Sequence, residues 1–477
     1  MEETRLKKLE LMRQKGVEPY GRHFRGSVAI KALLDNFQEG QEVRVAGRIM
    51  AVRSHGKSIF GDLRDQGAKL QFYIKLGTVS QEQFELFQNT VDIGDILGFS
   101  GKLFKTHTQE PTIEVKEYTV LAKSLRDLPE KWHGLKDVEM RFRKRYLDIL
   151  VNEKVRQTFL ARSRMVSKIR EFLDTRGYLE VETPMLHQLA GGAAGTPFKT
   201  HHDALDADLF LRIAPELHLK RLLVAGFDKV YEINRSFRNE GISIRHNPEF
   251  TMLEVYTAYA DCSDVMKLTQ ELITFLAKEI TGKTKLDYQG KEIDLDNWQV
   301  VSFPELMAQN YDIHPHEDEK IWVAKLKKKG VVLEKDVVSR TQLLNIIAEL
   351  IEPKAGAHPV FVTDLYAELC PLAKTKEGNP LLTDRFELFI AGMEVANAYS
   401  ELNDPQEQRK RFTEQLADAG ETHKIDEDFV TALEYGMPPA GGLGIGIDRL
   451  AMILTDSPSI REVILFPQLK PQENVSD

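Results

Sequence analysis

The stretch from Lys229 to Tyr259 constrains the fold more strongly than any other part of this sequence. Within it, the runs Val230 to Phe237 and Phe250 to Tyr259 carry β-branched and aromatic residues at the alternating spacing typical of strands. Four chain breakers separate the runs, namely Asn239, Gly241, Asn247 and Pro248. We therefore predict two antiparallel strands joined by a long loop.

The loop between these strands is dense in charge. It holds Arg238, Glu240, Arg245 and His246. Such a concentration of ionisable side chains is unusual for a segment that only connects two core strands.

Length and composition narrow the class of protein. A chain of 477 residues predicts two or three domains, and 42% hydrophobic with 29% charged residues is typical of a soluble globular protein. The net charge of −9 argues against a protein that coats polyanions generally, so nucleic acid would be bound through local patches or shape. Cys262 and Cys370 lack metal-ligand spacing, and we interpret them as buried free thiols in a reducing cytoplasm.

The N-terminus carries Glu2, Glu3 and Glu10, which argues against a signal or transit peptide. No segment approaches membrane-spanning length. We therefore expect a cytoplasmic protein that has no contact with a membrane.

Short strand-like runs fill the region from Glu42 to Ala122, with one possible helix near Ser80 to Asn89. The runs are Glu42–Arg53, Ser58–Asp65, Lys69–Ile74, Ile96–Phe104 and Thr112–Ala122. Five short strands with one inserted helix indicate an OB-type barrel, a fold that often binds single-stranded nucleic acid by stacking bases on aromatic rings. The aromatic and basic residues available for this are Phe60, Phe72, Arg48, Arg53, His55 and Lys57. Core packing is the favoured interpretation of Phe72.

A charged helix from Met1 to Gly16 precedes the barrel. Its basic residues fit an RNA backbone and a solvated helix face equally well. They are Arg5, Lys7, Lys8, Arg13 and Lys15.

The remainder of the chain mixes helices and strands. We predict helices at Asn152–Gly177, Asp261–Ile280 and Thr341–Ile351, and strands at His358–Cys370 and Arg385–Leu402. A glycine-alternating strand from Gly441 passes into a helix that opens with Asp448 and Arg449. The predicted class is α+β, with an N-terminal domain over residues 1–127, a linker over residues 128–150 and a larger domain over residues 151–477.

A glycine-rich segment runs from Leu189 to Thr196. It is not a P-loop, because no Gly-Lys-Ser/Thr follows it. Two interpretations stay open, a plain flexible loop and a loop that brings backbone close to a small ligand.

Three segments together resemble the signature motifs of the class II aminoacyl-tRNA synthetases. They are Gly177–Pro184, Phe237–Glu254 and Gly441–Arg449. The preceding barrel is similar to the subgroup specific for lysine, aspartate and asparagine. Within this subgroup, the chain is similar to the lysine enzymes of bacterial type. The similarity lies in the segments Gly191-Gly192-Ala193, Ala214–Leu217 and Asn397–Asp404 of the larger domain. The resemblance covers essentially the whole chain and implies a mainly antiparallel sheet flanked by helices after the barrel.

The resemblance implies that ATP activates L-lysine to lysyl-adenylate, which is then transferred to the 3′ end of tRNA(Lys). The attacking lysine carboxylate is ionised at neutral pH, so catalysis would rest on positioning and charge neutralisation without a general base. The family also implies Mg²⁺ as cofactor, bound by Glu387 and Glu394. A homodimer built around Gly177–Pro184 is a further implication.

Two arginines are the implied catalytic residues. The planar fork of Arg238 can bridge the carboxylate and the α-phosphate, and Arg449 at a helix start suits a γ-phosphate. Phe250 would stack on adenine. The implied ATP-binding residues are Arg238, Glu240, His246, Asn247, Phe250, Glu387, Gly442, Gly444, Gly446 and Arg449.

The implied lysine-binding residues are Gly192, Glu216, Arg238, Glu254, Tyr256, Asn397 and Glu401. The resemblance assigns Glu254, Tyr256 and Glu401 to the ε-ammonium. It assigns Asn397 to the carboxylate, and Glu216 with the Gly192 backbone to the α-amine. Glu254 and Tyr256 would share one face of a strand.

For the anticodon, the resemblance implies stacking on Phe60, reading of a uracil edge by Gln71 and Glu114, and phosphate support from Arg48. The chain departs from the family at Thr196, where a basic residue is usual. The absence of a basic side chain at this position could change how the glycine-rich loop closes over the adenylate.

Three alternatives remain to be weighed. An aspartate or asparagine enzyme of the same fold would need cations where this pocket is acidic. A non-catalytic RNA-binding or regulatory homologue would be expected to lose Arg238, Arg449 or the metal carboxylates, which are present. A paralogue that loads an amino acid onto another protein should lack the barrel.

Overall fold

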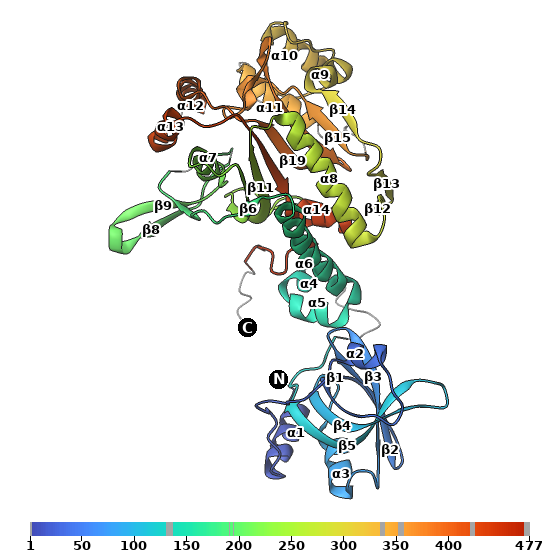
Figure 1. Ribbon diagram of the computed structural model, residues 1–477. Coiled ribbons are helices and arrows are strands. Elements are labelled where there is room, and N and C mark those ends of the chain that lie inside the picture. The colour runs from blue at the N-terminus through green and yellow to red at the C-terminus, as the bar shows by residue number, and fades with distance from the viewer. Residues whose placement is uncertain are drawn as a thin grey trace. The chain divides into compact units, whose positions relative to one another are not determined.

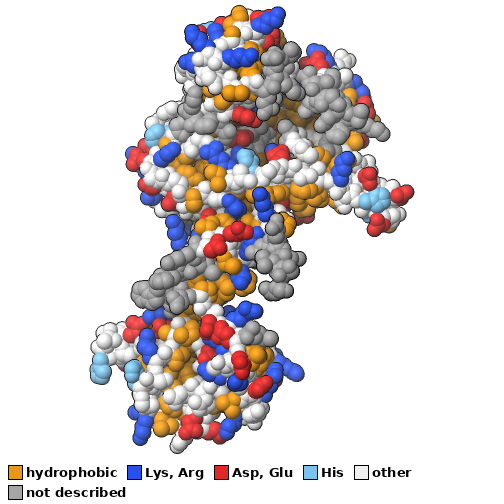
Figure 2. Space-filling view, turned by 180° about the vertical axis from the view of Figure 1, so that it is seen from behind, with side chains coloured by type: hydrophobic (Ala, Val, Ile, Leu, Met, Phe, Trp, Pro, Cys, Tyr) orange, Lys and Arg blue, Asp and Glu red, His pale blue; other side chains and the backbone are white. Residues whose placement is uncertain are grey.

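The computed structural model describes residues 2–129, 137–189, 191–193, 195–333, 339–351, 357–419 and 425–471. The chain forms two compact units, Met1–Glu153 and Lys154–Asp477 (Figure 1). On the face seen in Figure 2, Lys and Arg side chains are interspersed with Asp and Glu side chains over both units. Within the described residues, no helix is both long and apolar enough to cross a membrane.

The N-terminal unit is built on a closed five-stranded barrel, which confirms the predicted OB-type fold. Its strands, in the spatial order β1-β2-β3-β5-β4, are β1 Glu42–His55, β2 Ser58–Asp65, β3 Ala68–Lys75, β5 Pro111–Ala122 and β4 Ile96–Lys105. The helix α3 (Gln81–Thr90) lies between β3 and β4 in the chain, and the Ser80 side chain caps it. Phe72 is fully buried among apolar residues, as expected for a core residue.

Helix α1 (Glu3–Gln14) packs on the barrel through its basic residues as well as its apolar ones. Arg5 is buried, donates to the carbonyl oxygens of Ser124 and Ile93, and pairs with Asp127. The alternative in which Arg5 lies along RNA is therefore wrong, because its guanidinium is used to attach the helix. A second short helix, α2 (Ile30–Asp35), also belongs to this unit.

The predicted linker contains regular structure where it is described. Helices α4 (Val138–Arg143) and α5 (Arg145–Val151) occupy its second half, and Arg145 forms a buried ion pair with Asp148 at 2.9 Å. Residues 130–136 lie outside the described part of the chain.

The C-terminal unit is organised by one eight-stranded sheet. In spatial order its strands are β14 Gln299–Ser302, β15 Val360–Thr363, β18 Arg385–Ile390, β19 Met393–Ser400, β20 Ala440–Gly446, β11 Glu249–Ala258, β10 Lys229–Phe237 and β6 Leu179–Glu180. All neighbours are antiparallel except β14 with β15 and β10 with β6, the outermost pairs. The mainly antiparallel sheet is thus confirmed, and its centre contains the predicted hairpin.

Helices cover both faces of this sheet (Figure 1). One face packs its apolar side chains against α6 (Glu153–Asp174), α8 (Cys262–Thr281), α14 (Ile447–Leu454) and α15 (Ile460–Val463). On the other face, α9 (Phe303–Tyr311), α10 (Glu319–Lys328) and α11 (Arg340–Ile351) cover β15 and β18. Helices α7 (Glu216–Val224) and α13 (Glu427–Glu434) cover β10 and β11 on that same face, and α12 (Pro405–Ala419) contacts α13.

Smaller elements complete the unit. They are β7 Leu186–His187, β8 Lys199–His202, β9 Ala207–Leu211, β12 Lys285–Tyr288, β13 Lys291–Asp294, β16 Thr375–Lys376, β17 Asn379–Thr383 and the 3₁₀ turns η1 Asp203–Leu205 and η3 Ala367–Leu369.

The predicted strand His358–Cys370 is wrong in its second half. Pairing ends at Thr363, and Asp364 adopts the left-handed conformation with φ of 61°. This residue turns the chain out of the sheet, so Leu365 and Tyr366 are buried outside it and the segment that follows forms a short 3₁₀ turn instead of a strand.

The N-terminal cap of helix α8, at Asp261, is connected to the central sheet. The side chain of Asp261 accepts from the N–H groups of Ser263 and Asp264, and the N–H of Asp261 donates to the carboxylate of Asp264. The N–H of Cys262 donates to Ser400 Oγ at 2.9 Å, which joins the helix start to the end of β19. The cap therefore stabilises both the helix and the end of that strand.

We expect Asp261→Ala to lower the free energy of unfolding of the full chain by about 1 kcal/mol, because the helix loses its capping acceptor. Asp261→Asn keeps an acceptor oxygen and should stay close to wild type. Urea unfolding followed by circular dichroism measures both variants. Equal stability of the Ala and Asn variants would contradict the role given to the cap.

Candidate active site

The register of the central strands aligns chemically active side chains in two rows on the face opposite α8. One row runs from β11 to β18 through Glu254, Gly444, Asn397 and Glu387. The next row, two residues along each strand, is Tyr256, Gly442, Tyr399 and Arg385. Residues two apart on a strand point to one face, so the pleat itself gathers these groups.

These rows form the floor of a cavity of about 1400 Å³. Every residue that the resemblance assigns to lysine, ATP or Mg²⁺ lines this cavity except Glu387. The lining members are Gly192, Glu216, Arg238, Glu240, His246, Asn247, Phe250, Glu254, Tyr256, Glu394, Asn397, Glu401, Gly442, Gly444, Gly446 and Arg449. The structure therefore brings together residues that are as much as 257 positions apart in the chain, from Gly192 to Arg449.

One end of the cavity is acidic and dry. Glu216, Glu254 and Glu401 are exposed by only 6%, 7% and 1% of their surfaces. The hydroxyl of Tyr256 donates to Glu254 at 3.0 Å, and the hydroxyl of Tyr399 donates to Glu216 at 2.7 Å. Three buried carboxyl groups in one cavity are costly unless they are paired or bind a cation.

Burial dominates the titration of this acidic end. Loss of hydration, together with the charge of Glu216, raises the pKa of Glu254 to about 8. Burial also raises the pKa of Glu401 above its ordinary value, against the opposing effect of Lys220. The pKa values of Tyr256 and Tyr399 are raised as well, first by burial and then by the nearby carboxylates, so both phenols remain hydrogen-bond donors.

Lys220 is a fully buried member of this end that the sequence did not identify. Its Nζ lies 2.9 Å from Glu216 Oε1 and forms an ion pair with Glu401. A signal for it existed, because Lys220 follows Glu216 by four residues on a helix whose other inward residues are leucines. Tyr399 was also missed, although it lies two residues after Asn397 on the same strand face.

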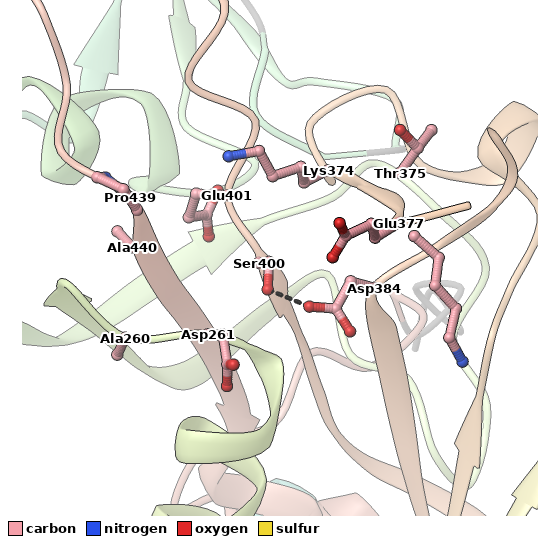
Figure 3. Close-up of a pocket in the computed structure, with 11 residues that line it drawn as sticks. Ala260, Asp261, Lys374, Thr375, Glu377, Asp384, Ser400, Glu401, Pro439 and Ala440 are labelled. Carbon is pink, nitrogen blue, oxygen red and sulfur yellow. Dashed lines mark hydrogen bonds between the residues drawn. The ribbon is translucent and has the colours of Figure 1, made fainter. Parts of the chain in front are cut away.

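Backbone contacts hold Glu401 in place just after the end of the central strand β19. Its N–H donates to the carbonyl of Ala440 at 2.8 Å, and it bridges to Ala373. The preceding Ser400 donates to Asp384, as drawn in the smaller pocket behind Glu401 (Figure 3). Glu401 lines both the smaller pocket and the main cavity.

Gly442 makes room for the same carboxylate. A Cβ at this position would lie 1.7 Å from Glu401 Oε1 and 2.8 Å from the Tyr256 ring. Any side chain here would displace the acidic cluster. The space above Gly442 is therefore occupied by residues assigned to lysine, whereas Gly444 and Gly446 leave more open strand surface.

The other end of the cavity carries two arginines. The guanidinium of Arg238 lies 5.2 Å from the centre of the Phe250 ring, and among the described residues none accepts a hydrogen bond from its buried Nε. Arg449 donates to the carbonyl oxygen of Glu394 at 2.7 Å and to its carboxylate at 3.1 Å. Its other nitrogen lies 3.2 Å from His246 Nε2, and burial together with this cation lowers the pKa of His246.

The start of α14 is tied to the hairpin and thereby positions Arg449. Asp448 accepts from the N–H of Thr251 at 2.8 Å and from Arg162 of α6 at 2.5 Å. Asn247 donates to the carbonyl of Glu249 at 2.7 Å, which fixes the return of the loop. The return end of the charged loop is thus held in place.

The described part of the glycine-rich segment lies against these groups. Gly192 has φ of 89°, where a side chain would be strained, and its Cα faces the Cβ of Glu216. The carbonyl of Thr196 accepts from the N–H of Asn239 at 2.7 Å, and a Cβ on Gly195 would meet Arg238 at 3.0 Å. The segment is therefore a wall of the cavity, in agreement with the ligand-binding interpretation. Ala190 and Ala194 lie outside the described residues.

A β-bulge determines where Glu394 points. The register of β18 against β19 shifts between Leu388 and Phe389, so that Leu388 pairs with Ala396 and Phe389 with Glu394. This extra residue brings Glu394 to the same face as Asn397, although the two are three apart. Glu387 accepts from Arg385 at 2.6 Å, and Asn397 accepts from the same arginine at 2.9 Å.

Carboxylate oxygens from neighbouring strands suit a small divalent cation such as Mg²⁺. Both glutamates are only partly buried, with 20% and 37% of their side-chain surfaces exposed. Among the described residues no third Asp, Glu, His or Cys joins them, so phosphate oxygens and water would have to complete the coordination shell.

In the barrel, the predicted anticodon residues occupy one outer face. Phe60 pairs across the strands with Tyr73, and Tyr73 with Glu114. The two rings stack at 4.5 Å, which makes Tyr73 an addition that strict alternation along β3 could have identified. Gln71 lies two residues before Tyr73 and accepts from Thr112 at 3.0 Å. Arg48 donates to the carbonyl of Gly94 at 2.6 Å, so part of its guanidinium is already engaged.

Comparison with known proteins adds two family matches. Residues 137–470 match the family described as tRNA synthetases class II (D, K and N), and residues 43–121 match the OB-fold nucleic acid binding domain. The chain is 52% identical to the lysine–tRNA ligases of Moorella thermoacetica and Carboxydothermus hydrogenoformans, over 98% of each chain. It is 47% identical to the lysine–tRNA ligase of Thermotoga maritima, over 99% of this chain and 96% of the relative.

The raised pKa of Glu254 makes stability depend on pH. The folded protein holds this proton up to about pH 8, whereas the unfolded chain releases it near its ordinary pKa of 4.5. Stability from this group is therefore complete at low pH and is lost as pH rises through this window, by up to about 1.4 kcal/mol per pH unit. The side chain in Glu254→Gln cannot ionise. We therefore expect the free energy of unfolding of this variant, relative to that of wild type, to increase from pH 5 to pH 8.

Urea unfolding of both proteins across that range measures the difference. Glu240→Gln removes an exposed carboxyl of the same cavity and is the matched control. Parallel curves for wild type and Glu254→Gln would show that Glu254 is ionised in the folded protein.

Proposed function

Because this chain belongs to the class II tRNA synthetases for aspartate, lysine and asparagine, we propose that it joins L-lysine to the 3′ end of tRNA(Lys) through a lysyl-adenylate formed from ATP. The lysine–tRNA ligases that it resembles match nearly its full length. One observation carries the assignment of chemistry to residues. A single cavity has three buried carboxyl groups at one end and two arginines at the other.

The acidic end supports recognition of lysine. An ammonium group that enters this dry end finds carboxylates that water does not screen. A neutral side chain would leave those carboxylates unpaired, and a site built around such pairing can reject it by about 10⁴-fold or more. We assign Glu254, Tyr256 and Glu401 to the ε-ammonium, and Glu216 with Gly192 to the α-amine.

Arg238 is one of the two arginines at the other end of the cavity, and it is close enough to Glu254 to lower the pKa of that carboxyl. Its Nε, without a partner among the described residues, leaves donor capacity for the substrate carboxylate and the α-phosphate, two anions that repel each other until a cation bridges them. The side-chain amide of Asn397 is oriented by Arg385, and its Nδ2 can donate to the same carboxylate. Activation of lysine then needs proximity and charge neutralisation, and no side chain has to remove a proton.

The nucleotide end supports ATP. Phe250 offers a ring face for adenine, and Gly444 and Gly446 leave the strand surface open. His246, Asn247 and Glu240 frame the same end from the charged loop. Arg449 would contact the terminal phosphate once its bonds to Glu394 and His246 rearrange.

Glu387 and Glu394 would hold Mg²⁺. The ion, when bound, would neutralise charge on the phosphates of ATP. Both carboxylates contact arginines in this structure, so arginine and metal would compete for the same oxygens.

The barrel supports binding of the tRNA anticodon. Phe60 and Tyr73 form a stacked aromatic surface, with Gln71 and Glu114 beside it as hydrogen-bonding groups. A homodimer around Gly177–Pro184 and a cytoplasmic location are parts of the same proposal. Exposed apolar side chains near that segment, Leu179, Met185 and Leu186, are consistent with an interface between subunits.

The alternatives fit this geometry less well. An aspartate or asparagine enzyme would place the substrate side chain against three carboxyl groups. A non-catalytic homologue is disfavoured because Arg238, Arg449 and both metal carboxylates keep positions in or beside the cavity. The barrel argues against a paralogue that modifies proteins.

A screen of lysine-dependent ATP–pyrophosphate exchange over all twenty amino acids tests the proposed function. We expect lysine alone to support exchange, and Arg238→Ala to lower kcat/KM by about 10³-fold or more, as for other charge-stabilising groups. Arg238→Lys keeps the charge but not the planar fork and should recover only part of the rate. Exchange at wild-type rates in Arg238→Ala would refute its role.

A second test separates the barrel from the cavity. Phe60→Ala removes a stacking surface worth about 1–3 kcal/mol per base, so we expect weaker tRNA charging with unchanged pyrophosphate exchange. Tyr20→Ala removes a surface aromatic outside the stacked pair and serves as the control. Normal KM for tRNA in Phe60→Ala would contradict anticodon stacking.

A further inference from the structure

Lys220 is a charged side chain at the acidic end to which the proposed function assigns no contact with lysine or ATP. It projects from α7 and is completely buried. Its Nζ contacts carboxylates from two distant parts of the chain, Glu216 at 2.9 Å on its own helix and Glu401 after β19. It also lies 3.5 Å from the carbonyl oxygen of Leu372.

A buried lysine usually loses its proton, because burial disfavours the charged form. Here the two carboxylates reverse that tendency, and the pKa of Lys220 is raised above its ordinary value despite burial. The rings of Tyr399 and Phe429 lie 5.7 Å and 5.9 Å from the ammonium and exclude water around it. Lys220 is therefore a fixed, permanent cation within the cavity wall.

The net charge of the acidic end matches the two ammonium groups of free lysine. Three carboxylates and one ammonium leave two negative charges when all are ionised. Free lysine carries two ammonium groups, on the α-carbon and at the end of its side chain. Without Lys220 the empty cavity would hold three mutually repelling carboxylates, and such groups retain protons instead of ionising together.

We propose, on the premise of the proposed function, that Lys220 is a positioning residue for the amino-acid substrate, bridging Glu216 and Glu401 so that the two carboxyl groups keep a fixed spacing for its ammonium groups. Glu401 then gives up its proton more readily than it would without this cation. Lys220 does not touch the reacting atoms, so it acts through these two glutamates. The ionisable groups facing it or its partners are Glu216, Glu254, Glu401, Tyr256 and Tyr399. Arg238 and Glu232 act on this set through Glu254.

Lys220→Met keeps most of the length of the side chain and removes its charge. We expect the KM for lysine in pyrophosphate exchange to rise by about tenfold at pH 7 for each unit by which the pKa of Glu401 rises. The defect should shrink towards pH 9, where Glu401 ionises again, while the KM for ATP stays unchanged. Lys220→Arg retains a cation and should keep the wild-type pH profile more closely.

Lys267→Met removes an exposed helical lysine and is the matched control. A lysine KM that rises equally at all pH values would show a merely structural ion pair and overturn the proposal. A lower KM in Lys220→Met would show a competitor for the carboxylates and overturn it as well. Absence of lysine-dependent exchange in wild type would instead refute the proposed function.

Should Lys220→Met fail to fold, Lys220→Gln removes the same charge with a polar side chain and is measured in its place. A lysine KM that rises at pH 7 and recovers towards pH 9 supports the proposal. A lysine KM that is unchanged, or that rises equally at all pH values, would contradict the proposal.

Discussion

Burial of three carboxyl groups in one cavity is the constraint on which the rest of this site depends. Each group loses hydration, and each is compensated by a specific neighbour: Tyr399 for Glu216, Tyr256 for Glu254, and Lys220 for Glu401. Compensation is incomplete at Glu254, whose pKa is raised to about 8, and at Glu401, whose pKa burial raises despite Lys220. The empty cavity therefore favours binding of a cation, and burial of its carboxyl groups lowers the free energy of unfolding of the protein.

The sheet gives this chemistry its precision. The pairing of β10, β11, β20, β19 and β18 aligns residues from three separate segments in two adjacent rows, and α8 and α14 support the rows from behind. Glycine at position 442 and the bulge in β19 are local adjustments that let Glu401 lie over the strand and turn Glu394 towards the cavity. A site formed on paired strands needs little rearrangement of its acidic end when a ligand binds.

Much of this could be predicted from the sequence, because its signals are local. Alternation gave the hairpin and the five barrel strands, and the resemblance to a family supplied roles for individual residues. Contacts between side chains that are far apart in the sequence could not be predicted from such local signals. Lys220 and Glu401 meet only after the sheet has formed, and the bulge that turns Glu394 depends on register. The false strand after Thr363 had the apolar composition of a strand, but its end depends on the backbone conformation of Asp364.

The central claim is that the acidic end holds a proton on Glu254 when it is empty and releases that proton when a cationic ligand arrives. Calorimetric titration of lysine into the full-length protein at pH 7, repeated in buffers of different ionisation enthalpy, counts the protons exchanged on binding. With the pKa of Glu254 at about 8 in the empty cavity, the account predicts release of close to one proton per lysine bound from this carboxyl, and release lower by about one proton from Glu254→Gln. Lysine binding without proton release in wild type would contradict it.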